Sequence, residues 1–81
     1  MTAIKYMVVA TFTEANLKIE AARFMIGLTT PFYCGDSEEE ARSIYNDLPN
    51  QDKELIAAKV SFTGTGSTAM IREWKCINKI L

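Results

Sequence analysis

The sequence contains no histidine, and this absence removes several kinds of chemistry at once. Histidine is the commonest general acid–base group and the commonest metal ligand in proteins. Serine–histidine–aspartate and cysteine–histidine catalytic arrangements are therefore excluded within one subunit. A structural zinc site needs a set of cysteine and histidine ligands that two cysteines cannot supply. We therefore expect no metal, no other cofactor and no enzymatic activity.

Cysteine is scarce as well, and Cys34 and Cys76 are too few for a disulfide scaffold. We expect both to be reduced and mostly buried thiols. Cys34 lies just before a predicted helix start, where a thiolate would be favoured. A reactive thiol at Cys34 is therefore the alternative.

No long apolar run is present. Residues 6–10 form an apolar segment that is too short for a signal peptide or a membrane span. The apolar fraction of 48% and the charged fraction of 23% are ordinary for a globular protein. We expect residues 1–81 to form a single small domain that is soluble, cytoplasmic and without a membrane partner.

A strong charge of one sign is also missing, since the net charge is −1. This value argues against strong non-specific attraction to nucleic acid or to an anionic membrane. The charges are unevenly distributed, however, because acidic residues dominate positions 28–54 and basic residues dominate positions 55–81. The sequence therefore predicts a surface with one acidic and one basic region.

Residues 37–48 form the one segment with a clear start, body and end. Ser37 and Glu40 form a capping box, and Asp36 with Glu39 offers a second register of the same motif. Pro49 disfavours a helical conformation at the residue before it and ends the helix. The apolar residues at helical spacing are Ala41, Ile44, Tyr45 and Leu48. The pattern predicts a short helix that needs an apolar surface to cover its stripe.

Two segments alternate in the manner of β-strands. Residues 4–12 are apolar on both faces, which is typical of a central strand, and residues 56–62 have one wet face. We expect an α+β fold: a small, mainly antiparallel sheet with the helix on one face and the element order ββαββ. The predicted core residues are Tyr6, Val8, Ala10, Phe12, Ala41, Ile44, Tyr45, Leu48, Ile56, Val60 and Phe62.

Residues 13–28 are consistent with two structures. Their ends suit a helix, with Thr13 as the N-cap and Gly27 just beyond the last turn. Their apolar residues, however, fall into two groups on a helical wheel. The alternation over residues 17–21 favours a strand whose phase slips at a β-bulge, and we adopt the strand. Pro31 should then interrupt any ladder, because proline has no N–H.

Residues 68–81 are ambiguous in the same way. Their periodicity favours a helix, whereas the glycine-rich turn at residues 64–67 favours a hairpin with residues 60–62. The order ββαββ adopts the hairpin. The alternative fold has additional helices at residues 14–26 and 68–80.

The outward face of the predicted helix is the first candidate binding surface. Capping and the helix dipole explain the acidic residues 36–40 without any function, so only the outward acidic face needs another explanation. The residues that we assign to this face are Glu38, Glu39, Arg42 and Asp47.

From this face we expect a small non-enzymatic protein-binding module that meets another protein with a basic surface. By analogy, it would be an inhibitor or adaptor of the kind found among accessory proteins of phages and mobile elements. The open edges of a small sheet also allow a homo-oligomer.

The basic C-terminal segment is the second candidate surface. One aromatic side chain among basic ones suits base stacking with phosphate contacts, so nucleic-acid binding is the alternative function. The residues are Arg72, Trp74, Lys75 and Lys79, with Lys59 as a further member. The loop at residues 64–68 lacks the lysine of a phosphate-binding loop and the third glycine of a dinucleotide motif, so we expect a tight turn there.

Overall fold

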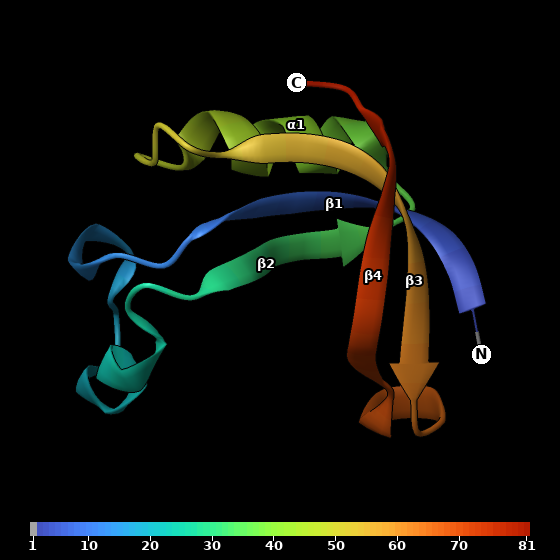
Figure 1. Cartoon of the computed structure of the whole chain (residues 1–81), viewed down its shortest axis with the longest axis horizontal. Helices are drawn as coiled ribbons and strands as arrows, with labels where there is room; N and C mark the ends of the chain where they lie inside the picture. Colours follow the sequence, from blue (N-terminus) through green and yellow to red (C-terminus); the bar gives the residue numbers. More distant parts are fainter. Residues whose placement is uncertain (1) are drawn as a thin grey trace.

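The computed structural model describes residues 2–81, apart from the side chain of Thr68. In chain order its elements are β1 (Thr2–Thr11), the short 3₁₀ helices η1 (Glu14–Asn16) and η2 (Glu20–Met25), β2 (Thr29–Gly35), α1 (Glu38–Asp47), β3 (Glu54–Thr63), the 3₁₀ turn η3 (Gly66–Thr68) and β4 (Met70–Lys79). The strands form one antiparallel sheet in the order β2-β1-β3-β4, with α1 on one face (Figure 1). The α+β fold and the order ββαββ are confirmed.

Helix α1 begins where the capping box predicts, but only half of the box forms, because the backbone N–H of Ser37 donates to the Tyr33 hydroxyl at 3.3 Å. The Ser37 hydroxyl accepts the backbone N–H of Glu40 at 3.1 Å, which selects this register over the one that begins at Asp36. Asp36 instead binds the ε-ammonium group of Lys5 at 2.8 Å. The predicted apolar stripe of α1 packs on the sheet against Val8 and Leu55, which are fully buried. Tertiary burial therefore supplies the cover that this short helix requires.

The sheet has a separate apolar cluster on each face. Met7 pairs with Ile56 and Val8 pairs with Leu55, so adjacent residues point to opposite faces. Val8 and Leu55 meet α1, whereas Met7, Val9, Ile56, Ala58 and Val60 form a cluster on the other face. We call that other face the concave face. Six predicted core residues are buried: Val8, Ala10, Phe12, Ala41, Ile56 and Val60. The prediction missed four buried residues, which are Met7, Val9, Leu55 and Ala58. Ile56, Val60 and Phe62 lie on the face away from the helix.

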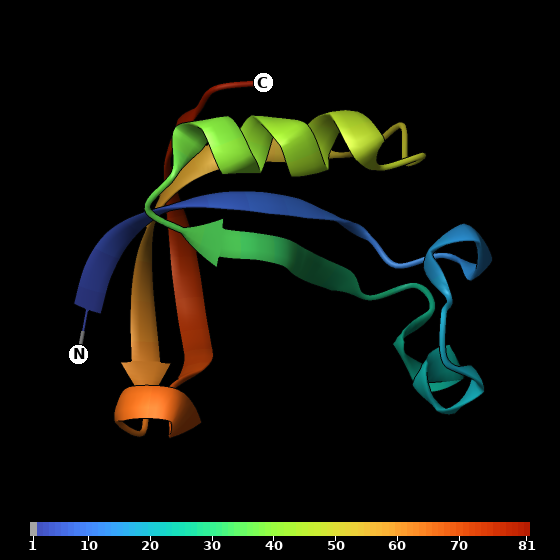
Figure 2. The same ribbon diagram turned by 180° about the vertical axis from the view of Figure 1, so that it is seen from behind.

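Curvature of the sheet partly covers the apolar cluster of the concave face. Figures 1 and 2 show that β3 bends sharply along its length, so that the hairpin it forms with β4 crosses the direction of β1 and β2. Trp74, Ile71, Phe62 and Cys34 pack at the edges of the cluster and are only partly buried. The bent sheet therefore covers part of its own apolar surface where no helix does.

Residues 14–26 are neither the adopted strand nor the alternative helix. They contain η1 and η2, and no side chain of either segment is buried. Arg23 forms ion pairs with Glu20 at 2.7 Å and with Glu14 at 3.1 Å. The apolar residues of this segment would not form one continuous apolar face in either a helix or a strand. Local contacts therefore determine its conformation.

The second strand of the sheet is β2, and it contains Pro31. Pairing with β1 shifts register between Val8 and Val9, and Pro31 lies opposite Val9. An edge strand tolerates proline, because one of its sides needs no ladder partner. The expectation that Pro31 would interrupt the ladder is therefore wrong, and the residue marks a register shift within the strand.

The C-terminal segment is strand β4, and the alternative helix at residues 68–80 is wrong. Val60 pairs with Trp74 and Phe62 pairs with Ile71, as the hairpin predicts. A register shift leaves Arg72 as an extra residue between these pairs. Ile71 and Trp74 consequently share a face although they are three residues apart, which explains why the sequence resembled a helix.

Candidate functional site

The four residues predicted on the outer face of α1 are not a continuous acidic surface. Glu38 accepts a hydrogen bond from the Arg42 guanidinium at 2.9 Å, so these two charges largely neutralise each other. Glu39 is exposed on the side of α1 opposite its apolar stripe. Asp47 is exposed at the far end of the helix. The structure therefore brings Glu38 and Arg42 together and leaves Glu39 and Asp47 apart from them.

Three carboxylates on α1 have no ion pair among residues 2–81: Glu39, Glu40 and Asp47. Glu40 and Asp47 are seven residues apart, which places them on the same flank of the helix. We call these three residues the acidic helix face. Glu40 was absent from the predicted set because its role in the capping box accounted for it, although the seven-residue spacing was visible in the sequence.

A groove with a volume of about 430 Å³ lies beside Asp47. It runs between the end of α1, the η1 region and β2, and its lining includes Phe32, Leu48 and Ile44. Phe32 stacks on Phe12 with ring centroids 6.3 Å apart, so the groove has a fixed aromatic wall. Nothing in the sequence indicated this groove, because its walls come from three separate segments.

The predicted basic surface is divided between the two faces of the sheet. Lys79 forms an ion pair with Glu54 at 3.3 Å, and Trp74 packs against the cluster of the concave face. Lys75 lies opposite Lys59 in the β3–β4 ladder, on the other face from Trp74. The aromatic ring and the free lysines therefore do not share a face.

Lys59 and Lys75 border a hollow of about 410 Å³ on the face that carries α1. Thr2, Ser61, Glu73 and Trp74 also line this hollow, and the Thr2 and Ser61 hydroxyl oxygens are 3.5 Å apart. Two like charges directly opposite each other on paired strands destabilise the pairing. No carboxylate among the described residues forms an ion pair with either lysine.

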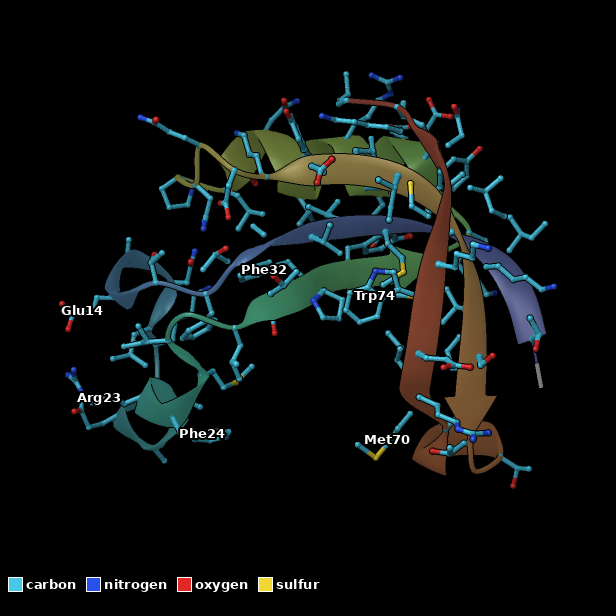
Figure 3. The ribbon with its side chains drawn as sticks, in the orientation of Figure 1. Glu14, Arg23, Phe24, Phe32, Met70 and Trp74 are labelled. Atoms are coloured by element: carbon cyan, nitrogen blue, oxygen red, sulfur yellow. The ribbon has the colours of Figure 1, made fainter. Side chains whose placement is uncertain are left out.

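The β1–β2 and β3–β4 strand pairs form two arms of the molecule, and large apolar side chains are exposed at the end of each arm. Phe24 on η2 is 78% exposed, and Met70 at the start of β4 is 69% exposed. Figure 3 shows these side chains at the ends of the β1–β2 and β3–β4 arms, with Trp74 in the angle between the arms. Single exposed apolar side chains are common on protein surfaces, so these residues alone do not indicate a binding site.

The two cysteines differ from their predicted environments. Cys34 is half-buried and Cys76 is exposed, so the expectation that both are mostly buried is wrong for Cys76. Burial raises the pKa of the Cys34 thiol above its ordinary value, although the nearby charge of Lys5 acts in the opposite direction. The structure therefore disfavours the thiolate that the position before the helix suggested.

We expect a thiol reagent such as an aromatic disulfide to modify Cys76 faster than Cys34 in the folded protein, because the thiolate must be reachable to react. The fast phase should disappear in Cys76→Ser and persist in Cys34→Ser. In denaturant both residues should react at similar rates, which controls for intrinsic reactivity. A fast phase that survives Cys76→Ser would reopen a catalytic or redox role for Cys34.

Within residues 2–81 no cluster of three or more histidine, cysteine, aspartate or glutamate side chains could hold a metal ion. None of the helices described for this chain combines the length and the apolar character needed to cross a bilayer. Comparisons with protein-family models, curated proteins and solved structures found no match. A functional proposal must therefore be argued from the surfaces described above.

Proposed function

We propose that this chain is a non-enzymatic protein-binding module, an inhibitor or adaptor that recognises a basic surface on another protein. The observation that carries the proposal is the acidic helix face, Glu39, Glu40 and Asp47, of which Asp47 lines the groove walled by Phe32. Stable interfaces combine a desolvated apolar anchor with a polar rim. The groove provides room for an apolar anchor, and the carboxylates provide part of a rim.

The position of α1 supports this use. The helix is fixed by its apolar stripe and by the Ser37 cap, so little conformational entropy is lost when its outer side chains meet a partner. The three carboxylates form no ion pair with the described residues of the chain, so binding to a basic partner breaks no existing ion pair. A partner with lysine or arginine side chains around one apolar residue would match both features, and its association rate would fall as salt increases.

The test starts from a partner captured from a lysate of the source cells, with and without nuclease, and then measures its affinity for variants. We expect Glu39→Lys with Asp47→Lys to weaken binding about tenfold or more, since both reversals oppose a basic surface. Glu20→Lys matches each single reversal in charge and lies away from α1, so it should leave affinity nearly unchanged. Both α1 residues are exposed, so circular dichroism should show an intact fold.

The outcome that contradicts the proposal is full affinity in the double variant. A loss of affinity in Glu20→Lys as large as in Asp47→Lys would also contradict it, because net charge and not the acidic helix face would then control binding.

The second candidate function is nucleic-acid binding, and the placement of Lys59 opposite Lys75 favours it. These lysines, with the hydroxyls of Thr2 and Ser61, could contact phosphates along a strand. Trp74 also lines the hollow, but its ring packs against the apolar cluster of the concave face and is only partly exposed, so base stacking on it receives little support. Nuclease-sensitive capture, and a low-salt gel shift that Lys59→Ala with Lys75→Ala removes, would favour this candidate over the first.

A further inference from the structure

Strand β4 is an outer strand of the sheet, and one side of its ten-residue backbone has no ladder partner among residues 2–81. Natural edges of this length are usually protected, because unpaired backbone groups recruit another strand. Two register shifts leave Arg72 and Ile77 as extra residues in β4. Between these bulges the strand is regular and can accept a partner.

We infer that β4 pairs antiparallel with β4 of a second copy of this chain, with Trp74 at the two-fold axis. This register places Glu73 opposite the partner's Lys75, and Lys75 opposite the partner's Glu73. The two four-stranded sheets would form one continuous sheet of eight strands, four from each copy.

The charges select this register over its neighbours. A shift that centres the pairing on Glu73 would set Glu73 opposite itself, and one that centres it on Lys75 would set Lys75 opposite itself. Like charges directly opposite each other destabilise a strand pair, and opposite charges stabilise it. The sequence around Trp74 is therefore complementary to itself in this register and repulsive in the two adjacent ones.

The second copy would also relieve a repulsion within each chain. Ser61 pairs with Glu73 and Lys59 pairs with Lys75, so these four side chains share a face in two adjacent rows. The partner's Glu73 would extend the row of Lys59 and Lys75 and bring a carboxylate beside their two like charges. On the concave face the two Trp74 rings would meet, next to the apolar cluster around Val60.

The inference is independent of the proposed function, because the acidic helix face lies on α1, which packs on β1, β2 and β3, whereas the inferred dimer pairs through β4. Sedimentation equilibrium at about 0.1 M salt, where surface pairs are only partly screened, tests it directly. We expect the wild-type chain to be dimeric toward the upper end of a series from about 10 µM to about 1 mM, since a single strand pair is a small interface.

Charge variants identify the interface. Lys75→Glu and Glu73→Lys should each weaken dimerisation about tenfold or more, because each sets like charges opposite one another twice. The swap Glu73→Lys with Lys75→Glu restores opposite charges and should restore the dimer. A wild-type chain that stays monomeric throughout the series, a dimer that both single variants leave intact, or a swap that fails to rescue would each overturn the inference.

Failure of this test can be told apart from failure of the proposed function. Charge reversal on the acidic helix face changes affinity for the heterologous partner and leaves the sedimenting mass unchanged. Charge reversal in β4 changes the mass, and circular dichroism of each single variant checks that the fold persists.

Discussion

Replacing Leu55 with alanine is expected to lower the free energy of unfolding by about 2–5 kcal/mol, the range found for large-to-small substitutions in a packed core. Leu55 is fully buried between Val8 of β1 and Ala41 of α1. Removing its side chain leaves a cavity where the helix meets the sheet. Small domains have a total stability of about 5–15 kcal/mol, so this single change would remove a large part of it.

Urea denaturation followed by circular dichroism measures the effect. The matched control is Leu28→Ala, because Leu28 is 53% exposed and loses far less buried area on truncation. A loss below about 1 kcal/mol for Leu55→Ala would show that α1 does not depend on this contact for its cover.

Replacing Asn50 with alanine is expected to cost about 1–3 kcal/mol, because it leaves buried polar groups without partners. Asn50 donates to the backbone carbonyl of Thr11 at 2.6 Å and accepts from the Asn16 side-chain amide at 3.0 Å. Among the residues that the structure describes, Asn50 is the only polar residue classed as buried. Its side chain ties the loop after α1 to the end of β1 and to η1.

The same substitution should loosen the groove, since Asn16 and Pro49 are among its lining residues. Hydrogen exchange should therefore speed up around residues 13–17 more than in β3. Asn46→Ala is the matched control, because Asn46 is exposed on α1 and forms none of these bonds. An Asn50 variant with unchanged stability and unchanged exchange in this loop would contradict the role assigned to the side chain.

The two proposed surfaces have a combined consequence. The β4 edge and the acidic helix face use different elements, so a dimer paired through β4 would keep both copies of α1 available. A partner with two or more basic sites would then bind both copies of α1 at once, and this bivalent binding would be tighter than binding to one copy. Variants that abolish the dimer should reduce this gain without changing the affinity of a single site.

The sequence determined the helix and the identity of much of the core. Ser37 and Pro49 specify where α1 begins and ends through a local cap bond and local sterics, so no distant residue is needed to predict these ends. The alternation of β1 on both faces also predicted a central strand. The acidic residues of α1 were visible for the same reason, although Glu40 was assigned only to capping.

The tertiary structure decided which residues share a surface. Pairing of Met7 with Ile56 sent Ile56, Val60 and Phe62 of the predicted core to the face away from α1. A bulge at Arg72 put Ile71 and Trp74 on one face. Register and bulges depend on contacts between distant segments, and a shift of one residue moves every side chain of a strand to the opposite face. Local sequence patterns therefore do not predict them. The pairing of Lys59 with Lys75 arises from the β3–β4 register. The groove beside Asp47 and the buried bonds of Asn50 arise from packing between distant segments. The sequence alone could not predict any of them.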